Sequence, residues 1–213
     1  MALAVKICGL NAPAAVAAAV DGGARLVGFV FFPASPRCVT PVRAATLARP
    51  VPAGILRVGL VVDADDATLA GIVAEAPLEM LQLHGAESPA RVAEVKARFG
   101  LPVMKVIPVS GEADLAHAAA YETVADRLLF DAKPLPGASR PGGNALPFDW
   151  TLLRERRWRL PWLLAGGLTA ETLAEAVRLS GATAVDVSSG VEDRPGVKNP
   201  AKIRAFLAAA ARL

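Results

Sequence analysis

The chain has 213 residues, a length that suits one domain, and we expect residues 1–213 to form it. Apolar residues make up 54% of the chain, which supports a sizeable core and argues against disorder. The 23 basic and 20 acidic residues are mixed along the chain and leave a net charge of only +3. A nucleic-acid binder usually gathers its basic residues on one element, so we expect no nucleic-acid partner.

The cysteines and the lengths of the apolar runs indicate in which cellular compartment the protein is expected. The two cysteines, Cys8 and Cys38, do not make a disulfide framework, and a reducing cytosol fits them. The alanine-rich start could imitate a secretory signal, but Asn11, Pro13 and Asp21 interrupt it. The sequence has no uninterrupted apolar run of roughly 18 residues, the length a transmembrane helix needs. We therefore expect a cytoplasmic protein without a membrane partner.

Short apolar runs that suit buried parallel strands recur along the chain. In chain order they cover residues 5–8, 26–31, 56–62, 80–84, 103–109, 127–131, 162–165 and 184–188. Amphipathic, alanine-rich segments between them predict helices over residues 13–20, 67–74, 90–99, 115–121, 170–179 and 201–213. Three of these helices are preceded by residues typical of helix starts, at 65–66, 88–89 and 169.

Eight strands that alternate with helices fit two architectures, a closed (β/α)8 barrel and an open doubly wound sheet. No G-x-G-x-x-G follows the first strand, which weakens the dinucleotide-binding form of the open sheet. The count of eight favours the barrel, so the expected fold class is α/β, a single (β/α)8 TIM barrel. A long segment rich in Pro and Gly, residues 133–147, follows the sixth strand, and such loops are usually functional or disordered.

In such a barrel the functional side chains lie at the C-terminal ends of the strands. The first strand ends in Cys8, whose thiol can act as a base or nucleophile once its pKa falls towards neutrality. A small buried core residue is the alternative for an isolated cysteine. The sixth strand ends in Asp131, a carboxylate that is costly to bury unless it is paired or solvated in a site. Asp131 is therefore a candidate general acid, with Cys8 as a partner that takes a proton.

Two further strand ends supply candidate binding groups. Arg37, in the loop after the second strand, is placed to clamp a carboxylate with two parallel hydrogen bonds, and a surface charge is its alternative. Gln82 and His84 point to the same side of the fourth strand and are expected to line the mouth of a pocket. A lone histidine is more often a satisfied structural residue, which remains the alternative for His84.

Glycine-rich turns follow the last two strands. Gly166 and Gly167 come after the seventh, and Ser188, Ser189 and Gly190 come after the eighth. Such turns leave backbone N–H groups free to hold a phosphate, and barrels commonly bind phosphate after strands seven and eight. The two turns together indicate a phosphorylated small-molecule substrate.

Seven segments, in order along nearly the whole chain, resemble the phosphoribosylanthranilate isomerase family. They are KICGL at 6–10, GFVFFPASPR at 28–37, VGLVVD at 58–63, LQLHG at 81–85, FDW at 148–150, LAGGL at 164–168 and VDVSSGVE at 185–192. The resemblance implies an Amadori rearrangement of N-(5-phosphoribosyl)anthranilate to an aminodeoxyribulose phosphate, a step of tryptophan biosynthesis that needs no cofactor and no metal.

The resemblance also assigns roles. Asp131 matches the general acid, which protonates the furanose ring oxygen, and Cys8 matches the general base, which takes the proton from ribose C2. Arg37 matches the residue that holds the anthranilate carboxylate, and Asp186 matches a carboxylate that contacts a ribose hydroxyl. The two glycine-rich turns match the phosphate-binding turns.

Several alternatives stay open. The histidine-pathway isomerase performs the same rearrangement on another phosphoribosyl amine, but it resembles a twofold repeated barrel whose first strand ends in aspartate, where this chain has Cys8. A bifunctional enzyme is disfavoured for the same reasons, and indoleglycerol-phosphate synthase would need a lysine and glutamate set that the sequence does not place. A non-catalytic ligand-binding barrel would lose the acid or the base, and Asp131 and Cys8 are both present. The chain is expected to be a monomer or a homodimer.

Overall fold

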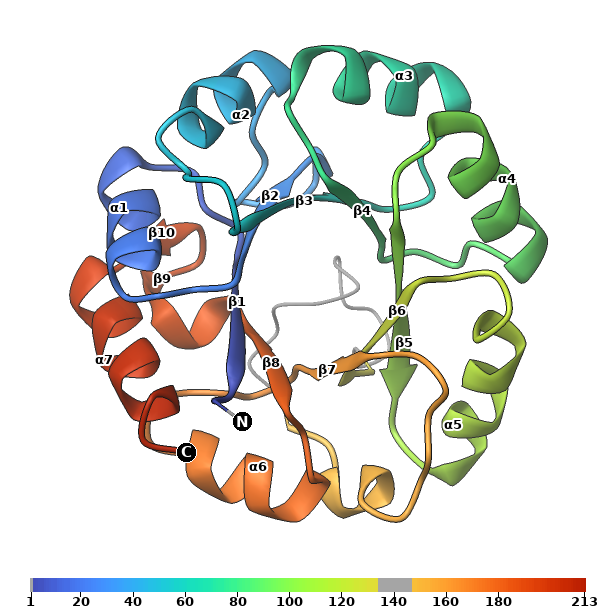
Figure 1. Ribbon diagram of the computed structural model, residues 1–213, viewed down its shortest axis with the longest axis vertical. Coiled ribbons are helices and arrows are strands. Elements are labelled where there is room, and N and C mark those ends of the chain that lie inside the picture. The colour runs from blue at the N-terminus through green and yellow to red at the C-terminus, as the bar shows by residue number, and fades with distance from the viewer. Residues whose placement is uncertain (1, 134–146) are drawn as a thin grey trace.

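The computed structural model describes residues 2–133 and 147–213. Eight parallel strands pair in chain order and close into a barrel, with the helices around its outside (Figure 1). The strands are β1 (Ala4–Cys8), β2 (Leu26–Val30), β3 (Leu56–Val61), β4 (Met80–Leu83), β5 (Val103–Val109), β6 (Arg127–Ala132), β7 (Trp162–Leu164) and β8 (Ala184–Val187). Each predicted strand forms within one residue of its predicted bounds, and closure of the barrel excludes the open doubly wound sheet.

The helices lie between successive strands and cover the barrel (Figure 1). They are α1 (Pro13–Asp21), α2 (Pro41–Ala48), α3 (Asp66–Glu75), α4 (Pro89–Phe99), α5 (Glu112–Ala118), α6 (Leu173–Ser180) and α7 (Pro200–Ala210). Short 3₁₀ helices are η1 (Ala119–Tyr121), η2 (Trp150–Leu153) and η3 (Ser189–Val191), and a small hairpin pairs β9 (Glu192–Arg194) with β10 (Val197–Lys198). The six predicted helices correspond to α1 and α3–α7. Helix α2, the 3₁₀ helices η2 and η3 and the hairpin were not predicted from the sequence.

Local capping explains where the helices begin. The Asp65 side chain accepts a hydrogen bond from the Thr68 N–H at 2.8 Å, and the Ser88 side chain accepts one from the Arg91 N–H at 3.2 Å. These contacts confirm two of the predicted helix starts. The unpredicted helix α2 begins in the same way, because the Thr40 side chain caps it and Pro41 occupies its first turn.

The helix predicted over residues 170–179 begins later, at Leu173. The Thr169 N–H donates to Thr172 Oγ1 at 2.9 Å, and the Thr172 N–H donates back to Thr169 Oγ1 at 3.3 Å. This reciprocal capping forms a turn before the helix, so the predicted start at residue 169 was three residues early. Most of the predicted loop at 133–147, residues 134–146, lies outside the described residues.

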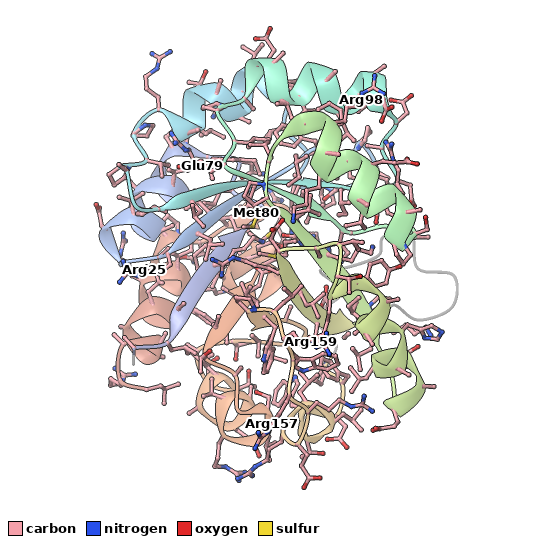
Figure 2. The ribbon with its side chains drawn as sticks, turned by 45° about the vertical axis from the view of Figure 1, so that its right-hand side comes forward. Arg25, Glu79, Met80, Arg98, Arg157 and Arg159 are labelled. Atoms are coloured by element: carbon pink, nitrogen blue, oxygen red, sulfur yellow. The ribbon has the colours of Figure 1, made fainter. Side chains whose placement is uncertain are left out.

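The strand side chains form two apolar layers. Alternate residues point outward to the helices, and the others point into the barrel. The inner set is Leu26, Val58, Met80, Met104, Val106, Leu129, Leu163 and Ala165, and Met80 appears near the middle of the molecule in Figure 2. The labelled Arg25, Arg98 and Arg157 are exposed at separate places on the surface (Figure 2). In the two described stretches, no helix combines the length and apolar character needed to cross a membrane.

Candidate active site

The predicted acid and base lie at the same end of the barrel. All eight strands are parallel, so their C-terminal ends meet at one mouth. Side chains alternate along a strand, and the alternation points Cys8, Asp131 and Asp186 into the barrel. All three are buried. Because β7 and β8 lie between β6 and β1 in the closed order, the two glycine-rich turns lie between Asp131 and Cys8.

The acid side of the mouth joins β4 to β6. His84 Nε2 lies 3.5 Å from Asp131 Oδ2, within ion-pair distance but long for a hydrogen bond. Gln82 Nε2 lies 3.3 Å from His84 Nδ1, which confirms that these two side chains share one side of their strand. The other carboxylate oxygen, Asp131 Oδ1, accepts a hydrogen bond from the Ala132 N–H at 2.9 Å. The structure thus brings together three of the predicted site residues.

The base side of the mouth joins β1 to β8. Lys6 Nζ lies 3.0 Å from Asp186 Oδ1, and both side chains are buried. Burial raises the pKa of the Cys8 thiol, the positive charge of Lys6 opposes that rise, and the net pKa is above its usual range. The Ser188 hydroxyl donates to the Cys8 carbonyl oxygen at 3.2 Å. Asp186, predicted to meet a ribose hydroxyl, therefore also holds a buried lysine.

Arg37 is buried at the rim of the mouth, which excludes the surface-charge alternative. Its Nε and Nη2 donate to the two carboxylate oxygens of Glu192, each at 2.8 Å, in a two-pronged pair. A Cβ placed on Gly9 would lie only 2.6 Å from Arg37 Cδ, so the arginine stem crosses directly over Gly9. This contact places the stem of Arg37 against the residue that follows Cys8.

Three further buried charges at the mouth had no role predicted from the sequence: Lys6, Glu192 and Lys198. Lys198 Nζ donates to Glu192 Oε1 and to the Ser188 carbonyl oxygen, both at 2.8 Å. Burial raises the pKa of Glu192, but Arg37 and Lys198 lower it by more, and burial lowers the pKa of Lys198. For Lys6 a signal was available, since a charge between Val5 and Ile7 in a buried strand has to be paired.

The two glycine-rich turns touch each other. Gly166 and Gly167 have φ values of 87° and 68°, in the region that favours glycine. A Cβ on Gly190 would lie 1.9 Å from the Leu168 carbonyl oxygen, so the turn after β8 packs directly on the turn after β7. A Cβ on Gly166 would lie 3.4 Å from Asp131 Oδ1, which places this turn beside the acid. Among residues 2–133 and 147–213, no three His, Cys, Asp or Glu side chains are grouped to hold a metal ion.

Comparison with known proteins agrees with this geometry. The family model for N-(5'-phosphoribosyl)anthranilate isomerase matches residues 5–209. The isomerase of that name from Rhodospirillum centenum is 60% identical over 100% of both chains. The solved phosphoribosyl anthranilate isomerase of Thermotoga maritima has a TM-score of 0.87 and 34% identity, over 99% of this chain and 100% of that one.

Another solved phosphoribosyl anthranilate isomerase was crystallised with reduced 1-(o-carboxyphenylamino)-1-deoxyribulose 5-phosphate. Its TM-score is 0.85 and its identity 32%, over 99% of this chain and 100% of that one. The matches extend over the strands, the mouth and both glycine-rich turns, since they cover almost the whole chain. The chain belongs to the N-(5'-phosphoribosyl)anthranilate isomerase family.

Proposed function

We propose that this chain catalyses the Amadori rearrangement of N-(5'-phosphoribosyl)anthranilate to 1-(2-carboxyphenylamino)-1-deoxyribulose 5-phosphate in tryptophan biosynthesis. The observation that carries the proposal is the arrangement at the mouth. Asp131 ends β6, Cys8 ends β1, and the two glycine-rich turns lie between them. A proton donor and a proton acceptor thus flank a region whose backbone can bind a phosphate.

The reaction needs one proton given and one taken. Asp131 protonates the furanose ring oxygen while the bond from that oxygen to C1 breaks, and the lone pair of the anilino nitrogen forms a Schiff base with C1. Cys8, as the thiolate, then takes the proton from C2, and the electrons of that bond move into the Schiff base to give an enolamine. Tautomerisation of the enolamine gives the ketone product. The ring oxygen and C2 are both bonded to C1, so acid and base act close together on one sugar, which suits groups on strands of one mouth.

The remaining residues bind and orient the substrate. The phosphate is held by the backbone of the turns at Gly166 and Gly167 and at 188–190, where Ser188, Ser189 and Gly190 stand. Asp186 meets a ribose hydroxyl with the carboxylate that Lys6 orients. His84 lies beside Asp131, and the fully buried Gln82 orients the His84 ring from below. The anthranilate carboxylate shares the Arg37 guanidinium with Glu192.

The direct test follows the fluorescence of phosphoribosylanthranilate generated in situ from anthranilate. Wild-type protein is expected to consume it rapidly, and buffer alone is the control for spontaneous decay. Failure of a folded wild-type protein to consume it would contradict the proposal. The non-catalytic barrel would then be tested first, by substrate binding, and the histidine-pathway amine second.

Arg37→Ala is expected to raise KM by roughly 10–100-fold, since charge-assisted bonds to the anthranilate carboxylate contribute about 1.5–3 kcal/mol. Arg37→Lys keeps the charge but loses the planar fork, so the KM of this matched variant should lie between those of wild type and Arg37→Ala. Steady-state kinetics and competition by inorganic phosphate measure the effect. An effect confined to phosphate competition would show that the carboxylate assignment is wrong.

Gly190→Ala is expected to raise KM by roughly tenfold or more, because a Cβ 1.9 Å from the Leu168 oxygen forces the two turns apart. Gly71→Ala is the control, since a Cβ there on α3 meets nothing within 4 Å. Competition by inorganic phosphate should weaken in parallel with KM in Gly190→Ala. Unchanged competition by phosphate in a folded Gly190→Ala protein would mean that these turns do not bind the phosphate.

We also place the chain in the cytoplasm, where its two unpaired cysteines, Cys8 and Cys38, suit a reducing compartment. Monomer and homodimer both remain predictions, and analytical ultracentrifugation distinguishes them.

A further inference from the structure

Lys6 is a buried charge to which the mechanism above gives no part beyond orienting Asp186. Its side chain is fully buried in β1, and its register partner on β2 is the apolar Leu26. A buried ammonium costs several kcal/mol unless it is paired. Its ion pair with Asp186 joins residues 180 positions apart, directly opposite each other in the register of β1 and β8. An apolar residue would fill the same space without the free-energy cost of burying a charge, so a functional role for the ammonium is expected.

The position of Lys6 relative to Cys8 supplies one. The two residues are two positions apart on β1, so both side chains point into the barrel. A Cβ on Gly28, the register partner of Cys8, would lie 3.0 Å from Cys8 Sγ and 3.3 Å from Lys6 Cε. The thiol and the end of the lysine side chain therefore converge over the same glycine.

The charges around Cys8 decide what this contact does. Burial opposes ionisation of the thiol, and so does the carboxylate of Asp186, whereas Lys6 and, more weakly, Lys198 favour it. Lys198 is itself ion-paired with Glu192, which also pairs with Arg37. Burial lowers the pKa of Lys6, but Asp186 and Cys8 raise it by more, so the net pKa of Lys6 lies above its usual range and favours the ammonium form.

We propose that Lys6 is a positioning residue for proton abstraction: its ammonium, held in place by Asp186, stabilises Cys8 as the thiolate, the form in which Cys8 acts as the base. The inference rests on the proposed function only for the role of Cys8, since the stabilisation itself is a property of the free protein. An opposite charge within about 4–6 Å of a group shifts its pKa by about 1–3 units. Gly28 serves the pair by leaving room for both side chains.

The test titrates Cys8 directly, through the ultraviolet absorbance of its thiolate. All proteins carry Cys38→Ser, so that the exposed second thiol does not contribute. Lys6→Met, which keeps the length without the charge, is expected to raise the midpoint by about one unit or more. The double variant Lys6→Met with Asp186→Asn removes both charges and should titrate between Lys6→Met and the parent. This order distinguishes the lysine charge from a general disturbance, and the double variant keeps the test valid if an unpaired Asp186 prevents folding.

Isomerase kinetics give the second measurement. At neutral pH, Lys6→Met should lose about tenfold or more in kcat/KM, and the loss should shrink once the pH passes the wild-type thiol midpoint, because wild type is then already ionised while the variant still gains thiolate. An unmoved midpoint, or a loss that stays constant above the wild-type midpoint, overturns the role of Lys6 while leaving the isomerase function intact. If Lys6→Met shifts the midpoint but the wild-type protein has no isomerase activity, the Lys6–Cys8 coupling stands and the proposed function is overturned.

Discussion

Asp131→Asn is expected to lower kcat by about 10²–10⁴-fold, the usual contribution of a general acid. Asparagine fills the same volume and can keep the contact that Asp131 Oδ1 makes with the Ala132 N–H. It has no acidic proton to give to the ring oxygen, so ring opening slows while KM stays within about threefold of wild type. Steady-state fluorescence kinetics measure both parameters.

Asp65→Asn is the matched control for this substitution. Asp65 caps α3 from the surface, and asparagine caps helices about as well, so its kcat should equal that of wild type. A large rise in KM with near-normal kcat in Asp131→Asn would make Asp131 a binding residue and remove it from the acid role. Circular dichroism of both variants checks that the barrel has formed.

The strands were predictable because their signal is local. Each is a short apolar run, and each forms within one residue of its predicted bounds. The missed helix α2 is only eight residues long, and Arg43 and Thr46 interrupt its apolar pattern, although Thr40 and Pro41 gave a start signal. The hairpin β9–β10 has strands of three and two residues, too short for the alternation of side chains to be read.

The site residues, too, were predictable where they depend on position along one strand, and not where they depend on tertiary packing. Strand ends and side-chain alternation placed Cys8 and Asp131 at the C-terminal end of the barrel and put the fully buried Gln82 on the same side of β4 as His84, because those follow from position along one strand. The pairing of Arg37 with Glu192 joins residues 155 positions apart, and no spacing rule gives such a contact. Tertiary packing alone decides that the arginine fork already has a carboxylate partner. A buried charge in the sequence predicts that a partner exists, but the partner is known only once the barrel closes.

Cys8→Ser is expected to lower kcat by about 10²–10⁴-fold, because a serine hydroxyl stays protonated where a thiol ionises. In wild type the base acts deprotonated, and burial raises the pKa of Cys8 while Lys6 opposes the rise. The net rise puts the thiol midpoint above its usual range, so wild-type kcat/KM should increase with pH through the neutral and mildly alkaline range. Cys8→Ser should lose that increase along with the activity. Cys38→Ser, at an exposed position, is the control and should keep both.

The double variant Cys8→Ser with Asp131→Asn decides whether acid and base act in sequence. Ring opening and removal of the C2 proton are separate steps in the proposed mechanism, so each substitution raises a different barrier. The double variant should then be about as slow as the slower single variant, since only the higher of the two barriers limits the rate. Losses that multiply would mean that Asp131 and Cys8 act on one shared barrier, with the proton leaving C2 as the ring opens. Cys8→Ser alone offers an independent check, because a sequential reaction lets the ring-opened Schiff base form ahead of the blocked step.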